Sequence, residues 1–133
     1  MTIRELSNSE CADLIATGGV GRVAFCTQDG PQIYPVNYTV AEGVIVFRTS
    51  AYSRLGLALV KRPRVVFEVD QLEHERMRGW SVVAQATAEP MDDPDEVVGL
   101  RPQSRLTPWA EGTRNLLVRL RWQELSGRRV GEW

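Results

Sequence analysis

Two arginines and three hydroxyl residues lie close together where an apolar segment ends. The stretch VFRTSAYSRL covers residues 46–55, and residues 44–47 are all apolar. Within the seven positions that follow lie Arg48, Thr49, Ser50, Ser53 and Arg54, here called the 48–54 cluster. Guanidinium groups can bind two phosphate oxygens at once, and hydroxyls and free N–H groups at the start of a helix also suit an anion. The cluster therefore predicts an anion site or, as the simpler alternative, a helix cap with solvated arginines.

Two further segments carry residues that suit a planar ligand. Asn37 and Tyr38 interrupt a mostly apolar strand, and pairing across the turn AEG would bring residues 37–40 near 44–47. An extended segment with Asn37 can offer backbone and amide hydrogen bonds to a heterocycle, although a half-solvated strand face fits the pattern equally well. Trp80, followed by Ser81, either stacks on a ligand or is a core or interface anchor, as most tryptophans are.

Other common chemistries have no good candidates. His74 is the single histidine and lies in a charged stretch, which leaves no Ser-His-Asp triad or histidine metal site. Cys11 and Cys26 are too few and too isolated for a zinc site or a disulfide framework. Neither a GxGxxG motif nor a Walker loop is present. No side chain is an evident acid, base or nucleophile, so a cofactor would have to carry any redox chemistry.

Composition sets the general class of the protein. The 133 residues are 43% hydrophobic and 25% charged, which is typical of one soluble globular domain over residues 1–133. A net charge of -1 and a pI near 5.9 give no general attraction to nucleic acid or to an anionic membrane. No apolar stretch has the length of a membrane span, and the start MTIRELSNSE does not resemble a signal peptide. We expect a cytoplasmic protein.

The elements before residue 64 follow from hydrophobic periodicity. Ser7 and Glu10 form a capping box that starts a short helix reaching Ala16. Alternating or apolar runs between turn signals predict three strands, at residues 20–27, 31–40 and 44–49. The third run is apolar at consecutive positions, which indicates that both of its faces are covered. A change to helical spacing then predicts a helix over 53–61, ended by Pro63.

The second half of the chain adds three predicted strands. They cover residues 64–70, 79–89 and 114–122, and the charged stretch QLEHERMR between the first two is predicted to be a solvated loop. The segment DDPDEVVGL, residues 92–100, starts like a helix. Six strands with short turns and little helix predict a mainly β fold, a small antiparallel barrel that is closed or partly closed.

Several of these segments, in this order, resemble one known family. GRVAF, YPVNY, IVFRTSAYSRL, FEVD, RGWSVVAQATAE and the ending TPWAEGTRNLLVRLRWQELSGRRV are similar to the pyridoxamine 5'-phosphate oxidase-like flavin-binding split-barrel proteins. The closest resemblance is to the short actinobacterial and nitroimidazole-resistance-like branch, and it runs from about Gly21 to Val130. It implies a six-stranded split barrel that forms a homodimer, with FMN in each of two clefts at the interface.

The resemblance also implies which residues contact the flavin. In the 48–54 cluster, the first three members match a strand end that meets the flavin and its phosphate, and the last two match the start of the next helix. Val36, Asn37 and Tyr38 match the strand along the isoalloxazine ring. Trp80 and Ser81 match positions that reach the flavin from the partner subunit. Together these ten residues are the cofactor-binding residues that we expect.

The function implied by this resemblance is that of an FMN-dependent oxidoreductase with an unassigned small-molecule substrate. Arg128 and Arg129 lie near the end of the chain but do not match the substrate-binding tail of the longer vitamin-making oxidases. The resemblance therefore does not extend to pyridoxamine phosphate oxidase activity itself. Two alternatives stay open on the same fold: a non-catalytic protein that binds or stores flavin, and a reductase that uses a deazaflavin.

Overall fold

Seven strands and two helices make up the described part of the chain. The computed structural model describes residues 2–91 and 115–133, so the helix expected at 92–100 lies outside the described residues. The elements in chain order are β1 (Ile3–Glu5), α1 (Asn8–Ile15), β2 (Gly19–Thr27), β3 (Gly30–Ala41), β4 (Val44–Ser50), α2 (Arg54–Leu59), β5 (Arg64–Glu73), β6 (Arg78–Met91) and β7 (Asn115–Val130).

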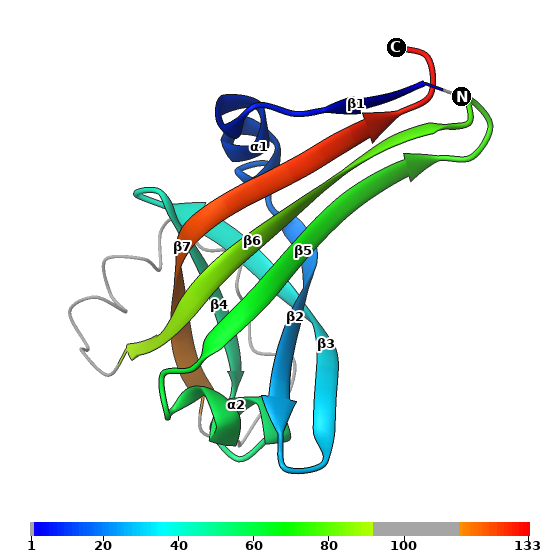
Figure 1. Ribbon diagram of the computed structural model, residues 1–133. Helices are drawn as coiled ribbons and strands as arrows, with labels where there is room; N and C mark the ends of the chain where they lie inside the picture. Colours follow the sequence, from blue (N-terminus) through cyan, green and yellow to red (C-terminus); the bar gives the residue numbers. More distant parts are fainter. Residues whose placement is uncertain (1, 92–114) are drawn as a thin grey trace.

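Six of the strands close into an antiparallel barrel, as the sequence predicted. The strands are hydrogen-bonded in the order β7-β4-β3-β2-β5-β6, and an additional pairing of β6 with β7 closes the ring. The seventh strand, β1, was not predicted. It pairs only with the last residues of β7, where Ile3 lies opposite Val130 (Figure 1). The strand pairs of the described residues are all antiparallel.

Three of the strands, β5, β6 and β7, continue beyond the barrel as an arm (Figure 1). The predicted loop at 71–78 was too long, because β5 continues to Glu73 and β6 begins at Arg78, so that the turn covers residues 74–77. These two residues lie directly opposite each other and form an ion pair of 2.9 Å. Charged residues were read as loop-forming, but here they pair across strands whose faces are partly solvated. For the same reason β7 runs to Val130, well past the predicted end at 122.

The β3–β4 hairpin fixes the register of the strands that carry most candidate residues. Its two turn residues, Glu42 and Gly43, have φ values of 53° and 79°, as a two-residue type I′ turn requires. The turn places Ala41 opposite Val44 and Tyr38 opposite Phe47, which confirms the predicted pairing of these segments.

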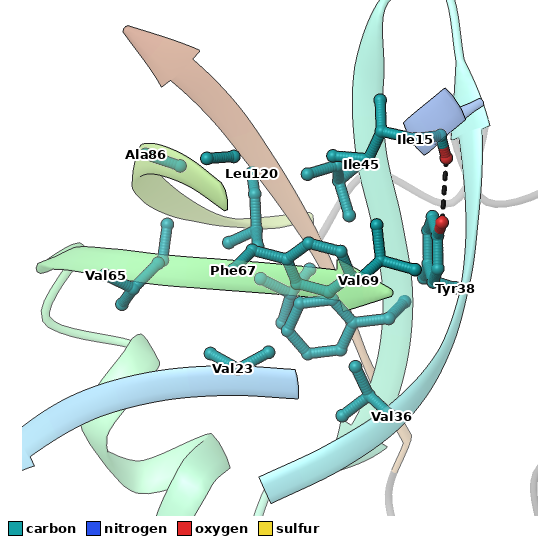
Figure 2. Close-up of a cluster of buried hydrophobic side chains, with 14 of the residues drawn as sticks. Ile15, Val23, Val36, Tyr38, Ile45, Val65, Phe67, Val69, Ala86 and Leu120 are labelled. Atoms are coloured by element: carbon teal, nitrogen blue, oxygen red, sulfur yellow. Dashed lines mark hydrogen bonds between the residues drawn. The ribbon is translucent and has the colours of Figure 1, made fainter. Parts of the chain in front are cut away.

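The core fills the barrel and is covered at one end by α2. Phe47 and Phe67 are fully buried, and the ring of Phe67 packs edge-on against Tyr38 with centroids 4.9 Å apart (Figure 2). Leu55 and Leu59 of α2 belong to the same cluster, as the predicted helical stripe required. Beneath the main core, on the other face of β4, a second small cluster holds Ala41, Val46, Met91 and Leu117. Both faces of β4 are thus covered, as its apolar run indicated.

Candidate functional site

The barrel opens between β3 and β4. These strands pair at four positions only, from Tyr38 opposite Phe47 to the turn. Beyond this point β3 continues along β2, whereas β4 pairs with β7, so that Arg48 lies opposite Leu117. Residues 31–37 of β3 and 48–50 of β4 thus face each other without a ladder between them. We call this opening the β3–β4 split.

The turns determine which backbone groups point into the split. In an antiparallel ladder, the residues that flank a two-residue turn form a hydrogen-bonded pair, and the direction then alternates along the strand. The pair Ala41–Val44 therefore directs the odd-numbered residues of β3, including Ile33 and Asn37, toward β4. On β4 the residues that face back are Arg48 and Ser50. Among residues 2–91 and 115–133, no strand pairs with these two edges of the split; the Ser50 carbonyl accepts from Ser53, as described below.

Pro31 and Pro35 agree with this assignment. Both are odd-numbered residues of β3, so their missing N–H groups fall on the side of the split and cost no ladder hydrogen bond with β2. The N–H groups left on this edge are those of Ile33 and Asn37. Asn37 is therefore placed as the sequence hypothesis required, with its backbone toward an open edge.

Arg48 lies on the outer face of the barrel. Side chains alternate along a strand, so Arg48 projects on the side of Val46, and Thr49 projects on the opposite side with Phe47. The Nε atom of Arg48 is buried and has no hydrogen-bond partner within the described part of the chain. A buried donor without an acceptor is costly and rare in native proteins. Arg48 therefore presents a cation with at least one unmet hydrogen bond beside the split.

The hydroxyl groups of the 48–54 cluster are engaged in shaping the chain between β4 and α2. Ser53 is the N-cap of α2: its Oγ accepts from Gly56 N at 2.9 Å and donates to the Ser50 carbonyl at 2.8 Å. The Oγ1 atom of Thr49 lies 3.2 Å from Ser53 Oγ. Ser50 Oγ accepts from Tyr52 N at 3.2 Å. The helix-cap interpretation is thus confirmed for Ser53. Because Ser53 donates its one hydroxyl proton to the Ser50 carbonyl, Thr49 is the donor in its contact with Ser53.

Gly56, which the sequence reasoning overlooked, allows α2 to pack against the end of β4. A Cβ atom at this position would overlap the carbonyl oxygen of Ser50. That carbonyl also accepts from Ser53 N at 3.1 Å. Glycine within a six-residue helix was the available signal, because it costs helix stability unless close packing requires it.

Arg54 and Gln32 join the two sides of the split. Arg54 is the first residue of α2, and its Nη1 donates to Oε1 of Gln32 on β3 at 3.3 Å. Gln32 is half-buried and was not among the residues singled out from the sequence. Its signal was weak, because a glutamine in an alternating strand looks like an ordinary surface residue.

Val36 and Tyr38 direct neither their backbone hydrogen-bonding groups nor their side chains into the split, because as even-numbered residues of β3 they pair with Gly21 and Gly19 of β2. Both side chains are buried in the core (Figure 2). The hydroxyl of Tyr38 donates to the Ile15 carbonyl at 2.8 Å, and burial raises the pKa of Tyr38 to about 12. The predicted alternation of β3 is confirmed, and it turns both of these side chains inward.

Trp80 and Ser81 lie on the arm, away from the 48–54 cluster. They follow the β5–β6 turn at the far end of the arm, whereas α2 lies at the opposite end of the molecule (Figure 1). Trp80 is only 6% exposed, and Ser81 is half-buried opposite Arg128. One subunit therefore does not bring these two residues to the split. Arg129, opposite Trp80, has a buried Nε without a partner among the described residues and stacks on Trp133 at 4.7 Å.

The part of the chain that the structure describes shows neither a cluster of metal-ligating side chains nor a membrane-spanning helix. Residues 2–91 and 115–133 contain no group of three or more His, Cys, Asp or Glu side chains that could hold a metal ion. Within the same ranges, neither helix is long and apolar enough to cross a membrane.

Comparison with known proteins identifies the family. A family model described as pyridoxamine 5'-phosphate oxidase matches residues 7–129. The chain belongs to this family. Among curated proteins, the uncharacterised protein Rv0080 of Mycobacterium tuberculosis is 32% identical over 130 residues, which are 95% of this chain and 84% of that protein. Membership in the pyridoxamine 5'-phosphate oxidase family confirms the resemblance seen in the sequence motifs.

Two solved structures have the same overall fold as the barrel described above. The FAD binding protein from Mycobacterium smegmatis superposes with a TM-score of 0.80 at 28% identity, covering 96% of this chain and 99% of that one. A FAD-binding protein from Mesorhizobium loti gives a TM-score of 0.84 at 22% identity, over 98% and 100% of the two chains. The second likeness shows the shared fold alone.

Proposed function

We propose that the protein is a flavin-binding oxidoreductase that holds FMN along the β3–β4 split, with a small-molecule substrate that stays unassigned. The observation that carries the proposal is the split itself. It combines an unpaired strand edge, which suits a planar heterocycle, with the arginines of the 48–54 cluster. Membership in the pyridoxamine 5'-phosphate oxidase family and the likeness to the FAD binding protein from Mycobacterium smegmatis support a flavin as the ligand.

The residues present fit a phosphate ester. Within residues 2–91 and 115–133 neither Arg48 nor Arg54 takes part in an ion pair, so both charges are uncompensated there. The buried Nε of Arg48 lacks an acceptor, and Arg54 has one neutral acceptor at 3.3 Å. Phosphate would supply the missing acceptors through charge-assisted hydrogen bonds.

The strand edge fits the ring of the flavin. The backbone groups of Ile33 and Asn37 that face the split match the donors and acceptors along the edge of an isoalloxazine. A bound flavin supplies hydride or electron transfer, so the chain needs no acid or base of its own for that step. The residues of this chain would position the ring and balance the charge of the phosphate.

We also propose that two copies of the chain form a homodimer. Val20 and Ile33 are 54% and 62% exposed on the outer face of β2 and β3, where Pro31 and Pro35 are exposed too. Adjacent exposed apolar side chains on one sheet face favour an interface. A partner would also account for the distant position of Trp80 and Ser81, which would contribute to the split of the other copy.

FAD is the second candidate ligand, because the relative from Mycobacterium smegmatis is described as a FAD binding protein. The deciding experiment is the absorbance spectrum of the purified protein, followed by release of the ligand and its identification by mass. We expect FMN. Recovery of FAD or of a deazaflavin would replace FMN in the proposal, and failure to bind riboflavin, FMN, FAD or deazaflavin at micromolar concentration would refute it.

Catalysis is tested separately from binding. The bound flavin is reduced with dithionite in the absence of oxygen, and its reoxidation by a quinone is followed by stopped-flow absorbance. An oxidoreductase should reoxidise more rapidly than free FMN at the same concentration. A slower reaction than that of free FMN would favour the storage alternative.

A further inference from the structure

We propose that Gln32 is a specificity-determining residue of the split, which orients Arg54 and makes affinity depend on a phosphate in the ligand. The inference rests on the proposed flavin function and adds a residue to it. Gln32 contacts the 48–54 cluster from the opposite side of the split, through the hydrogen bond from Arg54 Nη1 to Gln32 Oε1.

Gln32 lies on a part of β3 that does not pair with β4. β3 and β4 are not paired at this level, since their ladder ends at Tyr38 and Phe47. Gln32 itself pairs with Phe25 on β2, and its backbone is therefore held by the neighbouring strand. Arg54 belongs to α2, which packs by Leu55 and Leu59 against the core. The side-chain hydrogen bond thus joins two elements that are each held by the rest of the fold, and it fixes the Arg54 guanidinium beside Gln32 of β3.

The chemistry of the pair suits an exchangeable ligand. Gln32 is a neutral acceptor, so it orients Arg54 without cancelling its charge. An ionised phosphate is a stronger acceptor for a guanidinium than a neutral amide oxygen is, because both partners then carry charge. Only Nη1 of Arg54 is shown bonded to Gln32, so other N–H groups of the guanidinium can donate to a phosphate while Gln32 keeps Arg54 in place.

A glutamate at position 32 would neutralise the charge of Arg54 that Gln32 leaves available to a phosphate. Gln32→Glu keeps the size and shape of the side chain but places a carboxylate against Arg54, which becomes an internal ion pair. The phosphate of FMN must then compete with that carboxylate and is repelled by it. Riboflavin, which lacks a phosphate, is affected by neither effect. We expect Gln32→Glu to lose about tenfold or more in FMN affinity, corresponding to at least one charge-assisted bond, and to keep riboflavin affinity within about twofold.

A second substitution tests whether Gln32 acts through Arg54. Gln32→Ala removes the acceptor of the Arg54 guanidinium. We expect a loss of about threefold in FMN affinity, because Gln32 then no longer orients Arg54. In the Arg54→Ala background the same change should have no effect on FMN. A purely structural role of Gln32 would give equal losses in both backgrounds and for both ligands.

The experiment is a fluorescence titration of the full-length chain with FMN and with riboflavin, using the parent and each variant. Gln123→Glu is the matched control for charge, because Gln123 is exposed on β7 and bonded to Thr87 at 2.9 Å. Melting temperatures confirm that the variants fold. An unchanged ratio of FMN to riboflavin affinity in Gln32→Glu would overturn the inference. A fall of this ratio in Gln123→Glu as large as that in Gln32→Glu would overturn it too. If the parent binds neither ligand, the proposed flavin function itself fails.

Discussion

Replacing Arg48 by methionine should affect folding and FMN binding in opposite directions. Methionine keeps the length and much of the apolar stem of arginine, so packing beside the split is largely preserved. It removes the buried Nε that has no acceptor among the described residues. An unsatisfied buried donor costs about 1–3 kcal/mol, so its removal should leave the free energy of unfolding unchanged or raise it by about 1 kcal/mol.

The same substitution should weaken FMN binding. If Arg48 donates to the phosphate, the loss is that of a charge-assisted hydrogen bond, about 1.5–3 kcal/mol. Since 1.4 kcal/mol corresponds to a factor of ten, the dissociation constant for FMN should rise about 10- to 100-fold. Riboflavin binding should change little, because that ligand has no phosphate.

Two measurements test this reasoning. Urea unfolding, followed by tryptophan fluorescence, gives the stability of the ligand-free protein, and a flavin titration gives the two dissociation constants. Arg54→Met is the matched control, because Arg54 is exposed and its loss should leave stability within about 0.5 kcal/mol while weakening FMN in the same way. A destabilised Arg48→Met protein, or equal losses for FMN and riboflavin, would show that Arg48 is a structural residue and not a phosphate ligand.

Three other predictions follow from particular contacts. Gly56→Ala should destabilise the fold by about 1–3 kcal/mol, despite the higher helix propensity of alanine, because the new Cβ meets the Ser50 carbonyl; a melting curve checks this, and an unchanged Tm would refute it. Tyr38→Phe removes the hydroxyl donor of the Ile15 carbonyl, which then still accepts from the N–H of Gly18 at 3.5 Å, and should cost about 0.5–1.5 kcal/mol at neutral pH. Because the pKa of Tyr38 is raised to about 12 in the fold, its protonated form contributes stability below pH 10 that is lost as the pH rises toward 12, and unfolding curves over this range should show that loss in the parent but not in Tyr38→Phe. Ile33→Asp should convert the proposed homodimer into a folded monomer in sedimentation experiments, whereas Val60→Asp, at a residue exposed to 50% on the C-terminal end of α2, should remain dimeric.

Much of the fold could be predicted because its signals are local. The capping box at Ser7 and Glu10, the two-residue turn after Ala41 and the alternation along β3 each depend on neighbours in the chain, and each is present as expected. The arm was missed because residues 71–78 are charged. Charge indicates contact with solvent, but it does not distinguish a loop from a solvated strand whose partners lie elsewhere in the chain.

The sequence by itself determined the six-stranded barrel, the family resemblance and the concentration of cations and hydroxyls at residues 48–54. Only the tertiary structure decided which of the candidate residues have structural roles and which are available to a ligand. It commits Ser53 to capping α2, turns the side chain of Tyr38 into the core and leaves the Nε of Arg48 without a partner among the described residues. The cross-strand position of Gln32 was beyond the reach of sequence reasoning, because no local pattern brings it to Arg54. That contact exists because β3 and β4 separate after four paired positions, and the separation is set by the closure of the whole barrel.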